Sequence, residues 1–89
     1  MSELDQLRKQ ITQIDGKIIE LIAKRQQLIT KVGQYKREHQ LPVYCPEREA
    51  LLRTFHDTVS EEQQVSATMI AKVFEVLIEE SRRTQLNEQ

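Results

Sequence analysis

The chain has 89 residues, enough for one small domain spanning residues 1–89 and no more. Its 13 Lys and Arg against 14 Asp and Glu give a formal net charge of -1, which argues against a nucleic-acid-binding protein with a cationic face. Hydrophobic residues make up 38% and are grouped, so we expect a folded chain whose core is thin for a lone monomer, with self-association supplying the missing burial.

The first predicted element is one long amphipathic helix from about Glu3 to Gln40. Because a helix of about 36 residues is about 54 Å long at 1.5 Å per residue, it must extend past its own domain, and we expect a second copy of the chain to cover its apolar stripe. Gly33 lies inside this helix, where close approach of another helix would explain a glycine. The apolar residues recur in steps of three and four, the helical period, at Leu4, Leu7, Ile11, Ile14, Ile18, Leu21, Leu28, Val32 and Tyr35.

A second, shorter helix is expected after a break at Pro42, which pushes Leu41 out of the α region. Pro46 suits the first helical position, and the polar stretch at 60–64 is interpreted as a weak end or a loop. The predicted apolar face of this helix carries Arg48, Leu52, Phe55 and Val59.

Ser66 is predicted to cap a third helix of medium length that ends after about Gln85. Its apolar stripe consists of Met69, Ile70, Val73, Phe74, Leu77 and Ile78. The sequence therefore predicts an all-α fold of three helices, one very long, one short and one medium.

Charged residues interrupt the apolar stripe of the first helix. Arg25 occupies a core position between Leu21 and Leu28, and Lys36 lies on the same face about 16 Å further along. Two long cationic side chains at this spacing can hold an anion between them. The alternative is that Arg25 pairs with a carboxylate such as Glu20, or fixes the register of a coiled coil.

Further polar residues lie where the other two helices meet this end of the molecule. They are Arg48 and Glu49 at the start of the second helix, and Ser81 and Gln85 at the end of the third. Taken singly, the last two are typical of a fraying helix end. Together with Arg25 and Lys36, the set predicts an interior site for a small polyanion, since buried charges persist only when paired.

Arg8 lies 17 residues before Arg25, about 25 Å along the helix, so one small ligand cannot touch both within a chain. In an antiparallel dimer, Arg8 could serve the site of the neighbouring chain. The alternative is a solvated arginine paired with Asp5 or Glu3.

Several kinds of chemistry lack the residues they need. The single cysteine, Cys45, excludes an intramolecular disulfide and a zinc site of several cysteines, and His39 and His56 are interpreted as surface residues, so no metal or cofactor is expected. No apolar run reaches membrane-spanning length and the N-terminus has no signal-peptide core, which makes the cytoplasm the expected location.

Four segments, LRKQITQIDGKIIELIAKR, VGQYKRE, LPVYCPERE and VLIEESRRTQ, resemble the all-helical (AroQ-type) chorismate mutases, in order and spacing, over nearly the whole chain. The resemblance extends to the mutase modules fused to prephenate dehydrogenase, which also read LPxYxPERE. It implies an intertwined homodimer and the Claisen rearrangement of chorismate to prephenate, on the shikimate-pathway route to Phe and Tyr, without cofactor or metal.

The resemblance also implies roles for the polar residues. Arg25 and the neighbouring chain's Arg8 would bind the two carboxylates of chorismate, with Ser81 near one of them. Lys36 and Gln85 would hydrogen-bond the ether oxygen. Glu49 would contact the ring hydroxyl, and Arg48 would order the pocket.

Cys45 departs from the family pattern, because many relatives carry an acid there that helps to recognise the ring hydroxyl. Two alternatives keep the fold, an isochorismate-pyruvate lyase and a mutase of 4-amino-4-deoxychorismate. Glu49 and the pair Ser81 and Gln85 favour the chorismate mutase. The third alternative is a non-enzymatic helical interaction module, which would leave LPVYCPERE unexplained.

Overall fold

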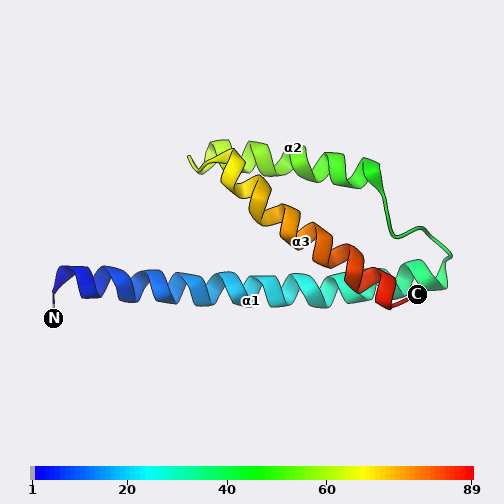
Figure 1. Ribbon diagram of the computed structural model, residues 1–89, viewed down its shortest axis with the longest axis horizontal. Helices are drawn as coiled ribbons and strands as arrows, with labels where there is room; N and C mark the ends of the chain where they lie inside the picture. The colour runs from blue at the N-terminus through cyan, green and yellow to red at the C-terminus, as the bar shows by residue number, and fades with distance from the viewer. Residues whose placement is uncertain (1) are drawn as a thin grey trace.

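The computed structural model describes residues 2–89, which form three helices (Figure 1). Helix α1 spans Glu3–Glu38, α2 spans Pro46–Glu62 and α3 spans Ala67–Asn87. The all-α class and the order of one very long, one short and one medium helix are thus confirmed. Helix α3 continues two residues beyond the end predicted at Gln85.

The helix starts follow the local sequence. The Ser66 hydroxyl accepts a hydrogen bond from the backbone N–H of Met69 at 3.2 Å, which confirms the predicted cap of α3. The Ser2 hydroxyl caps α1 in the same way through the N–H of Asp5, at 3.1 Å. Pro46 opens α2, where its missing N–H leaves no hydrogen bond unmade.

Helix α1 ends at Glu38, before Pro42 can act on it. Gln40 has a left-handed backbone with φ of 55°, and the N–H of Leu41 donates to the carbonyl of Lys36 at 2.8 Å. This bond spans six residues and satisfies one of the last free carbonyls of the helix. The helix therefore ends at a hydrogen-bonded backbone turn that precedes Pro42.

The stretch 60–64, interpreted from sequence as a weak end or a loop, is helical as far as Glu62. Ser60 is buried, and its hydroxyl donates to the carbonyl of His56 at 2.6 Å, so the helix accommodates this polar side chain without leaving it unpaired. The turn comes at Gln64, which is left-handed with φ of 58°.

The face of α2 that packs on α3 is displaced from the predicted one. Phe55 remains 61% exposed, whereas the imidazole of His56 stacks on the ring of Phe74 with centroids 3.8 Å apart. One position along a helix is a rotation of 100°, so this single step exchanges the two side chains. The expectation that His56 is a surface residue is therefore wrong.

Helix α3 holds the fold together, because it packs against both α1 and α2. It runs diagonally from the end of α2 to the carboxyl end of α1, and the amino-terminal part of α1 projects beyond the other two helices (Figure 1). The described residues extend over 57 × 24 × 15 Å with a radius of gyration of 16.5 Å. A compact domain of this length has a radius of gyration of about 12 Å.

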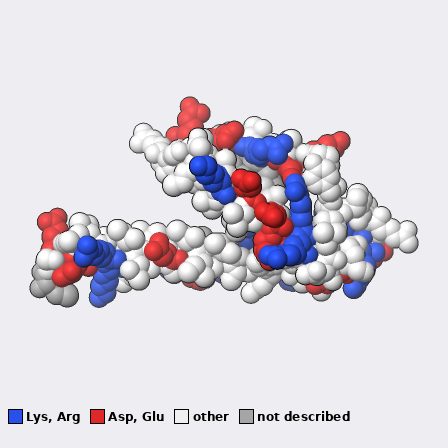
Figure 2. Space-filling model, in the orientation of Figure 1, with Lys and Arg blue, Asp and Glu red and all other residues white. Residues whose placement is uncertain are grey.

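The apolar stripe of α1 is present as predicted but lies uncovered, and Figure 2 shows long uncharged stretches along this helix. Leu7, Ile11, Ile14, Ile18 and Leu21 are all exposed, and no large apolar side chain of residues 2–89 is fully buried. The accessible surface is 7420 Å², whereas a folded monomer of this mass exposes roughly 5,400 Å².

Gly33 marks the point where α1 and α3 come closest. A Cβ atom at this position would lie 3.1 Å from the Cα of Gln85 and 3.1 Å from the Cβ of Glu88, tighter than ordinary van der Waals contact. The expected close approach of another helix at Gly33 is thus confirmed. A Cβ atom at Gly16, in the projecting part of α1, would meet nothing within 4 Å.

The two glycines therefore predict opposite effects of the same substitution. Gly16→Ala should raise the free energy of unfolding by about 1 kcal/mol, because alanine favours helix and its methyl group meets open space. Gly33→Ala should lower the free energy of unfolding despite the same gain in propensity, because α3 must move away from α1. Urea unfolding of both variants measures this, and stabilisation at both positions would contradict the close packing at Gly33.

Candidate active site

A cavity of about 360 Å³ lies where α1, α3, the loop after α1 and the start of α2 meet. Its apolar walls include Leu28, Ile29, Val32, Leu52 and Ile78. Six of the seven residues predicted for the site line it, and they are Arg25, Lys36, Arg48, Glu49, Ser81 and Gln85.

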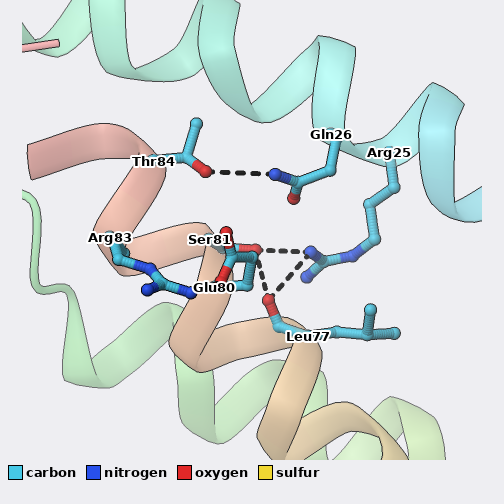
Figure 3. Close-up of polar contacts among 7 residues, drawn as sticks. All are labelled: Arg25, Gln26, Leu77, Glu80, Ser81, Arg83 and Thr84. Carbon is cyan, nitrogen blue, oxygen red and sulfur yellow. Dashed lines mark hydrogen bonds and ion pairs between the residues drawn. The ribbon is translucent and has the colours of Figure 1, made fainter. Parts of the chain in front are cut away.

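Arg25 reaches from α1 to the end of α3, where its guanidinium donates to the hydroxyl of Ser81 and to the carbonyl of Leu77 (Figure 3). The Ser81 hydroxyl in turn donates to the Leu77 carbonyl at 2.7 Å. Glu20 faces Lys17 and Lys24 instead, so the alternative ion pair with Arg25 is not formed.

The positive charge of Arg25 lies in an unfavourable environment. Burial and the nearby charge of Arg48 both lower the pKa of Arg25, and no carboxylate of residues 2–89 forms an ion pair with it. A partly buried cation beside a second cation is stabilised by an anion that the chain itself does not supply. The position therefore suits a carboxylate of a bound ligand.

Lys36 connects three parts of the fold. Its ammonium donates to Oε1 of Gln85 at 2.6 Å and to the carbonyl of Val43 in the loop at 2.9 Å. An ammonium has three N–H donors, so one remains for a ligand. Gln85 is 7% exposed, and its side-chain oxygen accepts the hydrogen bond from Lys36. The N–H donors of its amide nitrogen are therefore left for the cavity.

Arg82 also lines the cavity, although it was not among the residues predicted for the site. Its Nε donates to Oε2 of Glu49 at 2.9 Å and its Nη2 donates to Oε1, forming a forked ion pair that raises the pKa of Arg82. The guanidinium also lies over the ring of Tyr44, 5.0 Å from its centroid. Arg82 follows Ile78 by four residues and so continues the apolar stripe of α3, and this spacing could have identified it as a site residue from the sequence.

Arg8 is the one predicted site residue that lies apart from the cavity. It is exposed in the projecting part of α1, about 25 Å from Arg25 along the helix. No ion pair joins it to Asp5 or Glu3 within the described part of the chain.

The cavity carries more positive than negative charge although the whole chain has a formal charge of -1. Four cations line it, Arg25, Lys36, Arg48 and Arg82, against the single carboxylate of Glu49. A hollow of about 560 Å³ between α2 and α3 has the opposite balance, with four acidic residues and two arginines. Of these two hollows, the first therefore favours a small dianion.

Residues 2–89 contain neither a metal-ligand cluster nor a helix that could span a membrane. The His, Cys, Asp and Glu side chains there form no group of three that could hold a metal ion. None of α1, α2 and α3 is apolar enough over its length to cross a membrane.

An all-helical domain whose partly apolar cavity holds cations without a carboxylate partner among residues 2–89 is suited to a small organic anion. Comparison with known families narrows this class, because residues 7–86 match the family Chorismate mutase type II. The chain belongs to that family, as its sequence motifs predicted.

Relatives with similar sequences agree with this assignment. The T-protein of Haemophilus influenzae is 37% identical over 81 residues, which are 91% of this chain and 22% of that protein. A chorismate mutase of Methanocaldococcus jannaschii is 33% identical over 85 residues, which are 96% of this chain and 86% of that protein. The bifunctional chorismate mutase/prephenate dehydratase of Escherichia coli K12 is 33% identical over 79 residues, 89% of this chain and 20% of that protein. The chain thus spans about a fifth of the length of the T-protein.

His56 gives the fold a dependence on pH. Burial first, and then the charges of Arg25 and Arg48, lower the pKa of His56, outweighing the opposite effect of Asp57. The folded state therefore binds fewer protons than the unfolded state, so this contribution to stability is complete above about pH 6.5 and is lost as the pH falls below it.

We expect the urea concentration at the midpoint of unfolding to decrease between pH 7 and pH 5.5, and the substitution His56→Gln to make that decrease smaller. The exposed His39 is the matched control, and an equal reduction by His39→Gln would contradict this role of His56.

Proposed function

We propose that this chain catalyses the rearrangement of chorismate to prephenate, a step towards Phe and Tyr. The observation that carries the proposal is the convergence of Arg25, Lys36, Ser81 and Gln85 on one cavity in a chain of the chorismate mutase family. The reaction breaks a carbon–oxygen bond and forms a carbon–carbon bond within one molecule, with no proton transferred and no covalent intermediate. The protein has to hold the substrate in its compact conformer and to stabilise the charge that develops on the ether oxygen.

Positioning falls to the arginines. The guanidinium of Arg25, oriented by Ser81, would bind one carboxylate of chorismate, and Arg8 of the partner subunit the other. Arg48, which lines the cavity from the start of α2, would order it. When both carboxylates of chorismate are fixed, the side chain of the substrate that carries the ether oxygen can no longer rotate freely. This brings together the two carbon atoms of the substrate that form the new bond.

Charge stabilisation falls to Lys36 and Gln85. The Nζ atom of Lys36 lies 2.6 Å from Oε1 of Gln85, and one of its N–H donors remains for the ether oxygen. Donors fixed in advance need no reorganisation as the bond breaks, so they favour the transition state over the ground state. Glu49 would accept a hydrogen bond from the ring hydroxyl.

We further propose that the chain acts as an intertwined homodimer. The uncovered stripe of α1 and the large accessible surface are what a chain shows when its partner is removed, and obligate dimers bury 2,000 Å² or more. A partner helix lying antiparallel along α1 would also bring its Arg8 to the cavity. The reaction needs no cofactor or metal, and the cytoplasm stays the expected location.

The rival functions differ in what they need from the cavity. An interaction module has no use for cations that lack partners, whereas a lyase acting on isochorismate would use similar ones. Cys45 lines the cavity at the position where the family resemblance implies an acid in many relatives, so we assign recognition of the ring hydroxyl to Glu49. Assays with chorismate, isochorismate and 4-amino-4-deoxychorismate separate the three enzymatic functions.

Lys36→Ala tests the assigned chemistry. Loss of one donor to a developing oxyanion lowers turnover by about 100-fold to 1,000-fold, and we expect a loss of that size in kcat for chorismate with helicity retained. Lys31→Ala removes the same charge from an exposed position of α1 and should leave turnover unchanged. Consumption of chorismate with prephenate as product is the readout, and near-normal kcat in Lys36→Ala would exclude the assigned role.

Mixing of two inactive variants tests the shared site. In a heterodimer of Arg8→Ala and Lys36→Ala chains, one site carries both defects and the other carries neither. Co-refolding equal amounts should therefore restore about a quarter of wild-type activity. If Arg8 serves its own chain, or does not contribute to a site, the mixture will show no gain over the separate variants.

A further inference from the structure

The forked pair between Arg82 and Glu49 has a consequence for the choice of substrate. Both oxygens of Glu49 accept hydrogen bonds from one guanidinium, and the Glu49 side chain is 14% exposed. The carboxylate is thus largely removed from water and compensated by a single group. Because Glu49 is the acid of the cation-lined cavity, Arg82 decides whether the cavity contains a free negative charge.

Arg82 contacts a second residue besides Glu49. Its guanidinium carbon lies over the ring of Tyr44, in the loop before α2, 5.0 Å from the ring centroid. A guanidinium that is stacked and forked has little freedom to leave its partner. The pair therefore joins the loop, α2 and α3 in one arrangement at the wall of the cavity.

A compensated carboxylate distinguishes a hydroxyl from an ammonium group. Each carboxylate oxygen has further lone-pair capacity beyond its bond to Arg82, so Glu49 can still accept a hydrogen bond from a neutral hydroxyl. An ammonium at the same place would find a pair with no net charge and a guanidinium close behind it. Chorismate carries the hydroxyl on its ring, whereas 4-amino-4-deoxychorismate carries an amine that is protonated at neutral pH.

We propose that Arg82 is a specificity-determining residue, which neutralises Glu49 so that the cavity prefers a ring hydroxyl over a ring ammonium. The inference rests on the proposed function, because it concerns the substrate of the same site. Removing the guanidinium frees the carboxylate, which then repels the dianion of chorismate and attracts the ammonium of the amino analogue.

Arg82→Gln is the variant that tests this. We expect the ratio of kcat/KM for 4-amino-4-deoxychorismate to kcat/KM for chorismate to rise by about tenfold or more over wild type. Arg82→Lys keeps a positive charge beside Glu49 and should restore most of the original ratio. Both substrates are assayed on one preparation, so a loss of folded protein cancels from the ratio.

Two controls separate this effect from a general one. Arg83→Gln removes the neighbouring charge, which pairs with Glu80 and does not line the cavity, and should leave the ratio unchanged (Figure 3). In a Glu49→Gln background, Arg82→Gln should no longer raise the ratio.

An unchanged ratio in Arg82→Gln, or an equal change in Arg83→Gln, would overturn the inference while leaving the proposed function intact. Failure of the wild-type chain to convert chorismate would instead overturn the proposed function, and the inference with it.

Discussion

The close approach of α3 to α1 at Gly33 is the constraint on which the candidate site depends. Because no Cβ separates the helices there, the backbone of Gln85 lies against α1, and the ammonium of Lys36 can reach the Gln85 amide at 2.6 Å. One helical turn earlier on α3, the same approach brings Ser81 to Arg25. A larger residue at Gly33 would increase both separations, and the donors would no longer converge on one ligand.

Two cations of the cavity have no carboxylate partner among residues 2–89. Arg25 has Arg48 as a neighbour, and Lys36 contacts uncharged oxygens, so neither cation is compensated within residues 2–89. Three of the four ion pairs among residues 2–89 join side chains three or four positions apart on one helix, such as Lys17 and Glu20. The pair of Glu49 with Arg82 instead joins α2 to α3 and compensates the one acid of the cavity.

Much of this arrangement could be predicted from sequence, because helical periodicity is local. The three helices, the cap at Ser66 and the close approach at Gly33 followed from spacing and residue type alone. Six of the residues predicted for the site line one cavity, and each had been singled out because it interrupts or ends an apolar stripe. Arg82 and His56 were missed, since their partners Glu49 and Phe74 come from another helix and only the packing angle joins them.

The most direct test is the turnover of chorismate by Gly33→Ala, compared with Gly16→Ala and the wild-type chain. Displacement of reacting groups by about 1 Å can lower a rate 100-fold, so the shift forced by a methyl group at Gly33 should lower kcat/KM about tenfold or more. Gly16→Ala should match the wild type. If Gly33→Ala were folded and as active as the wild type, the spacing of α1 and α3 would not set the geometry of the site.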